Sequence, residues 1–201
     1  MIASFAPIRK RLRLAIRDGA ALQWSDDALD EIINEAQREY SVLSGSLVSA
    51  TTLVPDGSGV CVMPRDFIAP VKLIGPDGYE KPFFSWRALH DRYPDFRKIT
   101  GDHLLGAVVD FESHGRIRLF PVLPPGIPAG QLFYQRFAAK DKLEVTNTDA
   151  VEQHALYQLF MLSEKNAAFR YYAEFQKLLD RECSRERSVR SSSRIRKTRF
   201  Y

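Results

Sequence analysis

The sequence predicts an α+β fold in which helices from both ends of the chain form one helical layer, with an inserted antiparallel β-rich lobe and an extended C-terminal tail. Apolar residues recur every three to four positions in residues 8–40 and again in 151–179, a spacing typical of amphipathic helices. Between them, residues 46–137 contain short runs with a period of two, separated by Gly- and Pro-containing turns. The expected boundaries are 1–45 and 149–183 for the helical layer, 46–148 for the β-rich lobe and 184–201 for the tail.

The first expected helix starts at Pro7, because proline lacks the N–H that would be unpaired in a first turn. Its apolar stripe includes Ile8 and Leu12, and Gly19 is the expected end. The second helix is expected to begin after Ser25, a good N-cap. Its apolar residues fall at helical spacing: Leu29, Ile32, Ile33, Ala36 and Tyr40.

Two charged clusters accompany these helices. Arg9, Arg13 and Arg17 form a basic stripe, which we interpret as a solvated helix face in preference to a phosphate-binding one. The acidic residues at the start of the second helix are explained by the helix dipole better than by a metal: Asp26, Asp27, Asp30 and Glu31.

The β-rich lobe is expected to contain two hairpins and two further strands. The first hairpin joins 47–54 to 60–63 through a Gly-containing loop, and the second joins 104–111 to 116–120. The other strands are expected at 71–74 and 131–137. Ser85 is expected to cap a short helix that ends near Pro94, and the four prolines of 121–128 predict an extended connector.

The C-terminal helices are predicted from residue 149 onward. Asp149 and Glu152 have the spacing of a capping box. Apolar stripes follow in 151–162 and 168–179, with the polar residues 163–166 between them. Either one long helix or a helical hairpin fits this pattern, and we favour a break at 163–166.

Composition separates the last eighteen residues from the rest. The chain has 201 residues, 45% of them hydrophobic, which is enough for a sizeable core. Its net charge of +4 is unevenly distributed, because residues 1–183 carry 22 basic and 24 acidic side chains whereas 184–201 carry seven basic and one acidic. Such a tail buries too little apolar surface to offset its ordering entropy, so we expect it to be disordered in the isolated protein.

No motif for catalysis, a cofactor or a metal is recognised. The four histidines are scattered and lack metal-ligand spacing, and we interpret them as structural or surface residues: His90, His103, His114 and His154. Cys61 and Cys183 are far apart, which favours a reducing compartment. Because no catalytic motif is found, the expected protein is not an enzyme. No apolar run reaches the length of a spanning helix, so we expect a protein that has no membrane partner and is made soluble in the cytoplasm.

The order of several motifs resembles the head-to-tail adaptor (connector) proteins of short-tailed bacteriophages. These motifs are the helix at 24–36, the hairpin exit Met63-Pro64-Arg65-Asp66, the strand Arg116-Ile117-Arg118-Leu119-Phe120-Pro121, the strand Leu132-Phe133-Tyr134-Gln135-Arg136-Phe137 and the helix pair at 155–175. Together they cover most of residues 20–180. Each motif is degenerate by itself, and the resemblance depends on their order.

The resemblance implies a structural protein of the virion, at the head–tail junction, that passes through the host cytoplasm during assembly. Such adaptors form a homo-oligomeric ring, typically a dodecamer, between the portal protein and the tail nozzle protein, with DNA passing through the channel. Their β-rich lobe meets the tail component and their C-terminal tail inserts into the portal. The portal-binding residues expected here are therefore Arg185, Arg187, Arg190, Arg194, Arg196, Lys197, Arg199, Phe200 and Tyr201.

A nucleic-acid-binding protein is the alternative that the residues leave open. It would use the basic tail on phosphates, together with the stripe of Arg9, Arg13 and Arg17.

Overall fold

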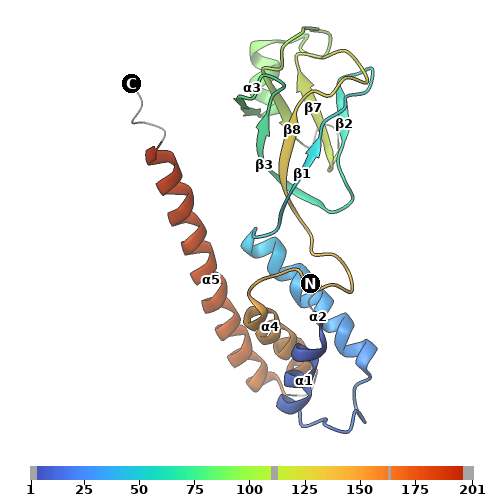
Figure 1. Ribbon diagram of the computed structural model, residues 1–201, viewed down its shortest axis with the longest axis vertical. Helices are drawn as coiled ribbons and strands as arrows, with labels where there is room; N and C mark the ends of the chain where they lie inside the picture. The colour runs from blue at the N-terminus through green and yellow to red at the C-terminus, as the bar shows by residue number, and fades with distance from the viewer. Residues whose placement is uncertain (1–3, 110–112, 163, 197–201) are drawn as a thin grey trace. The chain divides into compact units, whose positions relative to one another are not determined.

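The computed structural model describes residues 4–109, 113–162 and 164–196, with side chains described as far as residue 185. The chain folds into two compact units, one made of residues 1–46 and 138–201 and the other of 47–137 (Figure 1). The first unit contains the long helices, and the second contains two β-sheets with one short helix. The predicted α+β class is confirmed.

Two helices form the N-terminal part of the helical unit. α1 (Ala6–Ala15) has Pro7 in its first turn, as predicted. α2 (Asp26–Ser44) begins at the predicted cap, because the Ser25 hydroxyl accepts a 3.1 Å hydrogen bond from the N–H three residues on. It ends at Gly45, whose φ of 64° is the left-handed conformation that glycine adopts without strain.

α1 ends earlier than Gly19, the predicted stop. Arg17 takes the left-handed position with φ 57°, and the Asp18 N–H donates across the end of the helix to the Arg13 carbonyl at 2.9 Å. This is a Schellman ending with arginine where glycine is usual. The strain is offset by the Asp18 side chain, which holds the following turn as described below.

The C-terminal part consists of α4 (Thr148–Met161) and α5 (Lys165–Arg196). The predicted break between them is confirmed. The cap of α4 is Asn147, whose side chain accepts from the Ala150 N–H at 3.1 Å, so the predicted capping box at Asp149 is wrong. Asp149 instead lies in the first turn, where its negative charge interacts favourably with the positive end of the helix dipole.

The tail also differs from the sequence prediction. Residues 184–196 continue α5 as helix, where an extended and disordered segment was expected. Composition predicts whether a segment can fold by burying apolar surface, but this segment elongates a helix that is already formed. Elongation costs far less than nucleation, and arginine is a good helix former. Residues 197–201 lie outside the described part of the chain.

Replacing Asn147 with alanine should lower the free energy of unfolding by about 1 kcal/mol, because the Ala150 N–H loses its partner at the start of α4. Asp149→Ala is the matched control and should cost less, about 0.5 kcal/mol, since only the charge–dipole interaction is lost. Urea unfolding followed by circular dichroism measures both. A larger loss for Asp149→Ala than for the Asn147 variant would restore Asp149 as the cap.

The β-rich unit contains two four-stranded sheets. Sheet 1 is antiparallel and has the order β1 (Val48–Thr52), β8 (Gln131–Arg136), β3 (Phe67–Ile74) and β4 (Glu80–Lys81). Sheet 2 has the order β2 (Val60–Val62), β7 (Arg116–Phe120), β6 (Gly106–Val109) and β5 (Phe83–Phe84), in which β5 and β6 are parallel. The main core lies between the sheets and includes Leu53, Phe67, Leu73, Ile117, Leu119 and Leu132. A second cluster packs α3 against sheet 2 and includes Leu89, Phe96, Val108 and Phe120.

The second predicted hairpin is confirmed, with β6 and β7 paired from Gly106 opposite Phe120 to Val109 opposite Ile117. The first is wrong, because β1 and β2 belong to different sheets. The turn between them does form, since the Asp56 N–H donates to the Val60 carbonyl at 2.9 Å.

β1 and β2 do not pair because Leu53, the residue after β1, is hydrogen-bonded to the segment before β8. The Leu53 N–H donates to the Gly130 carbonyl at 2.9 Å, and its carbonyl accepts from the Ala129 N–H at 2.8 Å. β1 is thereby extended along β8, and the turn carries the chain to the other sheet.

The remaining predicted elements are present. α3 (Trp86–Arg92) begins after Ser85, whose hydroxyl accepts from the N–H three residues on at 3.1 Å. β3 is longer than the predicted strand 71–74 and includes Pro70, next to an irregularity in its register with β8. Residues 123–130 carry no strand and connect β7 to β8.

Candidate partner-binding surfaces

α5 is fixed to α4 by aromatic packing along its first half. Phe175 is fully buried. The rings of Tyr157 and Tyr172 lie 4.9 Å apart between centroids, and those of Phe160 and Tyr171 stack at 5.0 Å. Aromatic pairs of this kind add to the stabilisation that burial provides. This half of α5 is therefore a structural part of the helical unit.

His154 supports the same interface from α4. Its ring is 1% exposed and its centroid lies 4.7 Å from that of Phe175. Nε2 lies 3.1 Å from a carboxylate oxygen of Glu39. Burial lowers the pKa of His154, although Glu39 and Glu35 act in the opposite direction. The ring is therefore neutral at pH 7 and serves as a core residue, in agreement with its interpretation as structural.

The packed part of α5 ends at Cys183. Its thiol lies 3.9 Å from the Leu43 carbonyl at the end of α2, whereas Ser184 and Arg185 are exposed. In Figure 1, α5 continues past the ends of α2 and α4. The change in composition at residue 184 therefore coincides with the point where α5 leaves the body of the helical unit.

The basic tail residues fall into three groups. Arg185 is exposed. Four others lie on the helical backbone of α5, namely Arg187, Arg190, Arg194 and Arg196. The last four predicted residues lie outside the described part of the chain: Lys197, Arg199, Phe200 and Tyr201. Helical spacing places positions 187, 190 and 194 on one face, and cations near the C-terminal end of a helix are favoured by its dipole.

The N-terminal basic stripe does not form a free surface. Arg9 pairs with Asp26 at 2.6 Å and with Asp30 at 3.2 Å, and Arg13 pairs with Asp26 at 2.5 Å. Arg17 alone of the three is exposed. The predicted solvated face is therefore wrong for Arg9 and Arg13, which fasten α1 to the start of α2. The same ion pairs occupy two of the carboxylates in the acidic cluster.

Asp18 is the residue that organises the link between α1 and α2. Its side chain is 3% exposed, and its oxygens accept from the N–H groups of Leu22, Gln23 and Trp24 at 2.8, 3.2 and 3.0 Å. Arg13 lies 3.1 Å away. Burial would raise the pKa of Asp18, but the backbone N–H groups and Arg13 outweigh it and the pKa is lowered.

Asp18→Asn should lower the melting temperature at pH 7, because the lowered pKa means that the ionised form stabilises the fold. That stabilisation is complete above the ordinary carboxyl pKa of 3.8 and is lost as the pH falls through the lower value of the folded state. The difference from wild type should therefore shrink below about pH 4. Calorimetry from pH 7 to 3 measures it, with the exposed Asp27→Asn as control. A difference that stays constant with pH would contradict this account.

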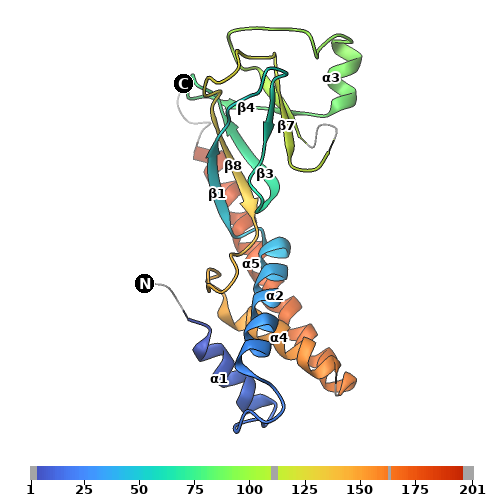
Figure 2. The same ribbon diagram turned by 90° about the vertical axis from the view of Figure 1, so that its right-hand side faces the viewer.

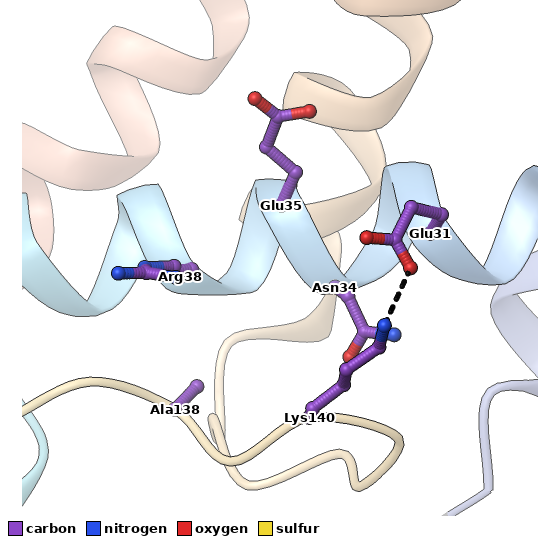
Figure 3. A pocket seen from close by; sticks show the side chains of 6 residues that line it. All are labelled: Glu31, Asn34, Glu35, Arg38, Ala138 and Lys140. Carbon is purple, nitrogen blue, oxygen red and sulfur yellow. Dashed lines mark ion pairs between the residues drawn. The ribbon is translucent and has the colours of Figure 1, made fainter. Parts of the chain in front are cut away.

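A pocket of about 450 Å³ lies between α2 and the segment that follows β8 (Figure 3). Glu31 and Lys140 pair across it at 3.2 Å. Asn34, which also lines it, exchanges hydrogen bonds with the Asp141 side chain at 3.0 Å and the Asp141 N–H at 2.9 Å. These contacts tie the connecting segment to α2, so we assign the pocket a structural role.

The described residues contain no cluster of three or more His, Cys, Asp or Glu side chains that could hold a metal ion. Burial raises the pKa of the Cys61 thiol to about 12, which leaves it protonated and unreactive. In the same part of the chain, no helix combines the length and apolar character needed to span a bilayer.

Sequence reasoning missed Asp18 and the Asn147 cap. The signal for Asp18 was weak, because its partners are backbone groups four to six residues away. Asn147 precedes the predicted cap by two residues and is an equally good capping residue. The spacing of the apolar residues that follow does not decide whether Asn147 or Asp149 is the cap.

One of two comparisons with known proteins places the chain in a family. The model of a family described as SU10 adaptor protein matches residues 3–198, nearly the whole chain. A search of curated proteins returns no match.

Proposed function

The chain belongs to the SU10 adaptor protein family and is a structural adaptor of a phage, and on that premise we propose that it forms a ring joining the portal protein to the tail nozzle protein. In this proposal the C-terminal tail docks on the portal and DNA passes through the ring. The protein acts at the head–tail junction of the virion and performs no chemical step.

The observation that supports portal docking is the basic extension of a fixed helix. α5 is packed against α4 and α2 as far as Cys183 and then continues with a strongly positive segment. A charged segment that protrudes from a folded body is accessible to a partner with a complementary surface. Repetition around a ring supplies avidity, so each contact can be weak.

Exposed apolar side chains support self-association of the helical unit. Leu14 on α1 is 69% exposed, and Leu162 and Phe169 beside the α4–α5 turn are 75% and 60% exposed. Leu14 and Phe169 lie on different helices, and a head-to-tail contact of a cyclic ring joins two different surface patches. Exposed apolar groups in a folded unit are candidates for burial between subunits.

Removing residues 184–201 should leave a folded protein that no longer joins portal rings. Ser184 and Arg185, the last residues whose side chains are described, are exposed, and exposed substitutions usually cost little, so the free energy of unfolding should change by less than about 0.5 kcal/mol. Co-sedimentation with purified portal should fall to roughly a tenth of the wild-type fraction or less. Normal assembly of the truncated chain would overturn the role of the tail.

A pair of variants separates the loss of positive charge from the loss of the arginine side chain. Arg187, Arg190 and Arg194 are replaced together by glutamine or by lysine. The glutamine variant should lose portal binding, and the lysine variant should retain a larger share because it keeps the charge.

The nucleic-acid alternative is tested with the same variants. Its basic stripe is weakened, because Arg9 and Arg13 are held in ion pairs. Filter binding to bare duplex DNA should show no affinity that depends on the tail at 150 mM salt. Salt-sensitive binding that disappears on truncation, without loss of portal binding, would favour a DNA-binding function.

A further inference from the structure

The exposed side of α2 carries a row of carboxylates. They occupy every fourth position and all are exposed: Asp27, Glu31, Glu35 and Glu39. Residues four apart lie on one side of a helix, so these side chains form one surface, which we call the acidic α2 face. Arg38 is the one cation in the sequence of α2. Glu31 pairs with Lys140, but both side chains are 68% exposed, and such surface pairs are weak.

The outward side of α5 is basic. The buried residues of this helix lie on one side: Ala168, Phe175 and Leu179. Three exposed cations fall about half a turn away from them, and we call their surface the basic α5 face: Arg170, Lys177 and Arg181. Two acidic residues lie beside it. Asp180 is exposed, and Glu174 pairs with Lys177 at 2.9 Å.

The two faces match in position along their helices. α2 and α5 run in the same direction (Figures 1 and 2), and the Cys183 thiol lies 3.9 Å from the Leu43 carbonyl, 140 positions away in the chain. Both helices rise about 1.5 Å per residue, so positions 31, 35 and 39 lie level with about 171, 175 and 179. The three cations of the basic α5 face are each within about 3 Å of one of these levels.

We infer that the acidic α2 face of one copy of the chain docks on the basic α5 face of the next copy. The inference rests on the proposed function, from which it takes the ring, and it adds which two faces meet. Copies related by rotation about an axis along the helices keep the levels of their residues. Glu31 of one copy then faces Arg170 of the next, and Glu35 faces Lys177.

A second copy fits these surfaces better than DNA or an acidic partner does. Figure 1 shows α2 and α5 on different sides of α4, so the two faces are separate surfaces. DNA would neutralise the basic α5 face and be repelled by the acidic α2 face. A further copy of the chain carries both charges at matching levels and covers both faces. Because the contact joins two different surfaces, it is head-to-tail and continues around a ring.

The test reverses each face separately. One full-length variant carries Glu31→Lys with Glu35→Lys, and the other carries Arg170→Glu with Arg181→Glu. Each alone should lower the fraction of chain in rings about tenfold or more, measured by native mass spectrometry after mixing with purified portal. An equimolar mixture of the two should restore rings, because one variant is positive on both faces, the other is negative on both, and the two alternate. A chain with all four substitutions should also form rings.

The matched control reverses two exposed arginines of the β-rich unit, Arg65→Glu with Arg87→Glu, and should form rings at the wild-type level. Thermal melting followed by circular dichroism checks that each variant folds. Rings of wild-type chain should also become fewer as salt rises from about 50 to 500 mM, a measurement that needs no variant.

Two results would overturn the inference: undiminished rings in both face-reversed variants, or a mixture that forms no more rings than its components. Loss of DNA binding by the Arg170→Glu and Arg181→Glu variant, without loss of rings, would assign the basic α5 face to DNA instead. Wild-type chain that forms no ring with portal, in contrast, would overturn the proposed function itself.

Discussion

The helical unit depends on the burial of α4 between three other helices. α4 contacts α1, α2 and α5, and its buried residues lie on more than one side: Ala150, Val151, His154, Ala155, Leu156 and Leu159. The N-terminal and C-terminal parts of the chain meet on this helix, since Arg11 of α1 pairs with Glu152. Without α4, α1 and α5 would keep only their smaller contacts with α2, which leaves much of each apolar stripe exposed.

A second constraint is that the β-rich unit is inserted into the helical unit through two neighbouring segments. The Arg136 N–H donates to the Leu47 carbonyl at 3.0 Å, which joins the entry and exit of the insert. Just outside it, the side-chain amide of Gln37 donates to the carbonyls of Ala139 and Lys142 at 3.1 and 3.0 Å. Because both ends are fixed close together, the insert completes its own core without interrupting the helical one.

Sequence patterns predicted the elements better than their partners. Caps at Ser25 and Ser85 and the β6–β7 hairpin depend on nearby residues, and they were predicted. The pairing of β1 was not, because it is decided by Gly130 and Ala129, more than seventy residues away. For the same reason, the ion pairs of Arg9 and Arg13 were read as a solvated surface.

For the basic segment after Cys183, the sequence likewise predicted one property and not another. The position of the basic segment was predicted from composition, and the end of α5 packing at Cys183 agrees with it. Its conformation was not predicted, because charge content describes what a segment cannot bury and says little about whether a preceding helix can be elongated. α5 supplies that preceding helix, held in place by Phe175.

The helical form of residues 184–196 sets the reach of the segment that we propose docks on the portal. As a helix, thirteen residues reach about 20 Å, whereas an extended strand of the same length reaches about 43 Å. A helix also presents arginines at 187, 190 and 194 on one face, where an extended segment would spread them over both sides. If the portal binds this face, little ordering entropy is lost on docking, and the charge of each arginine contributes to affinity directly.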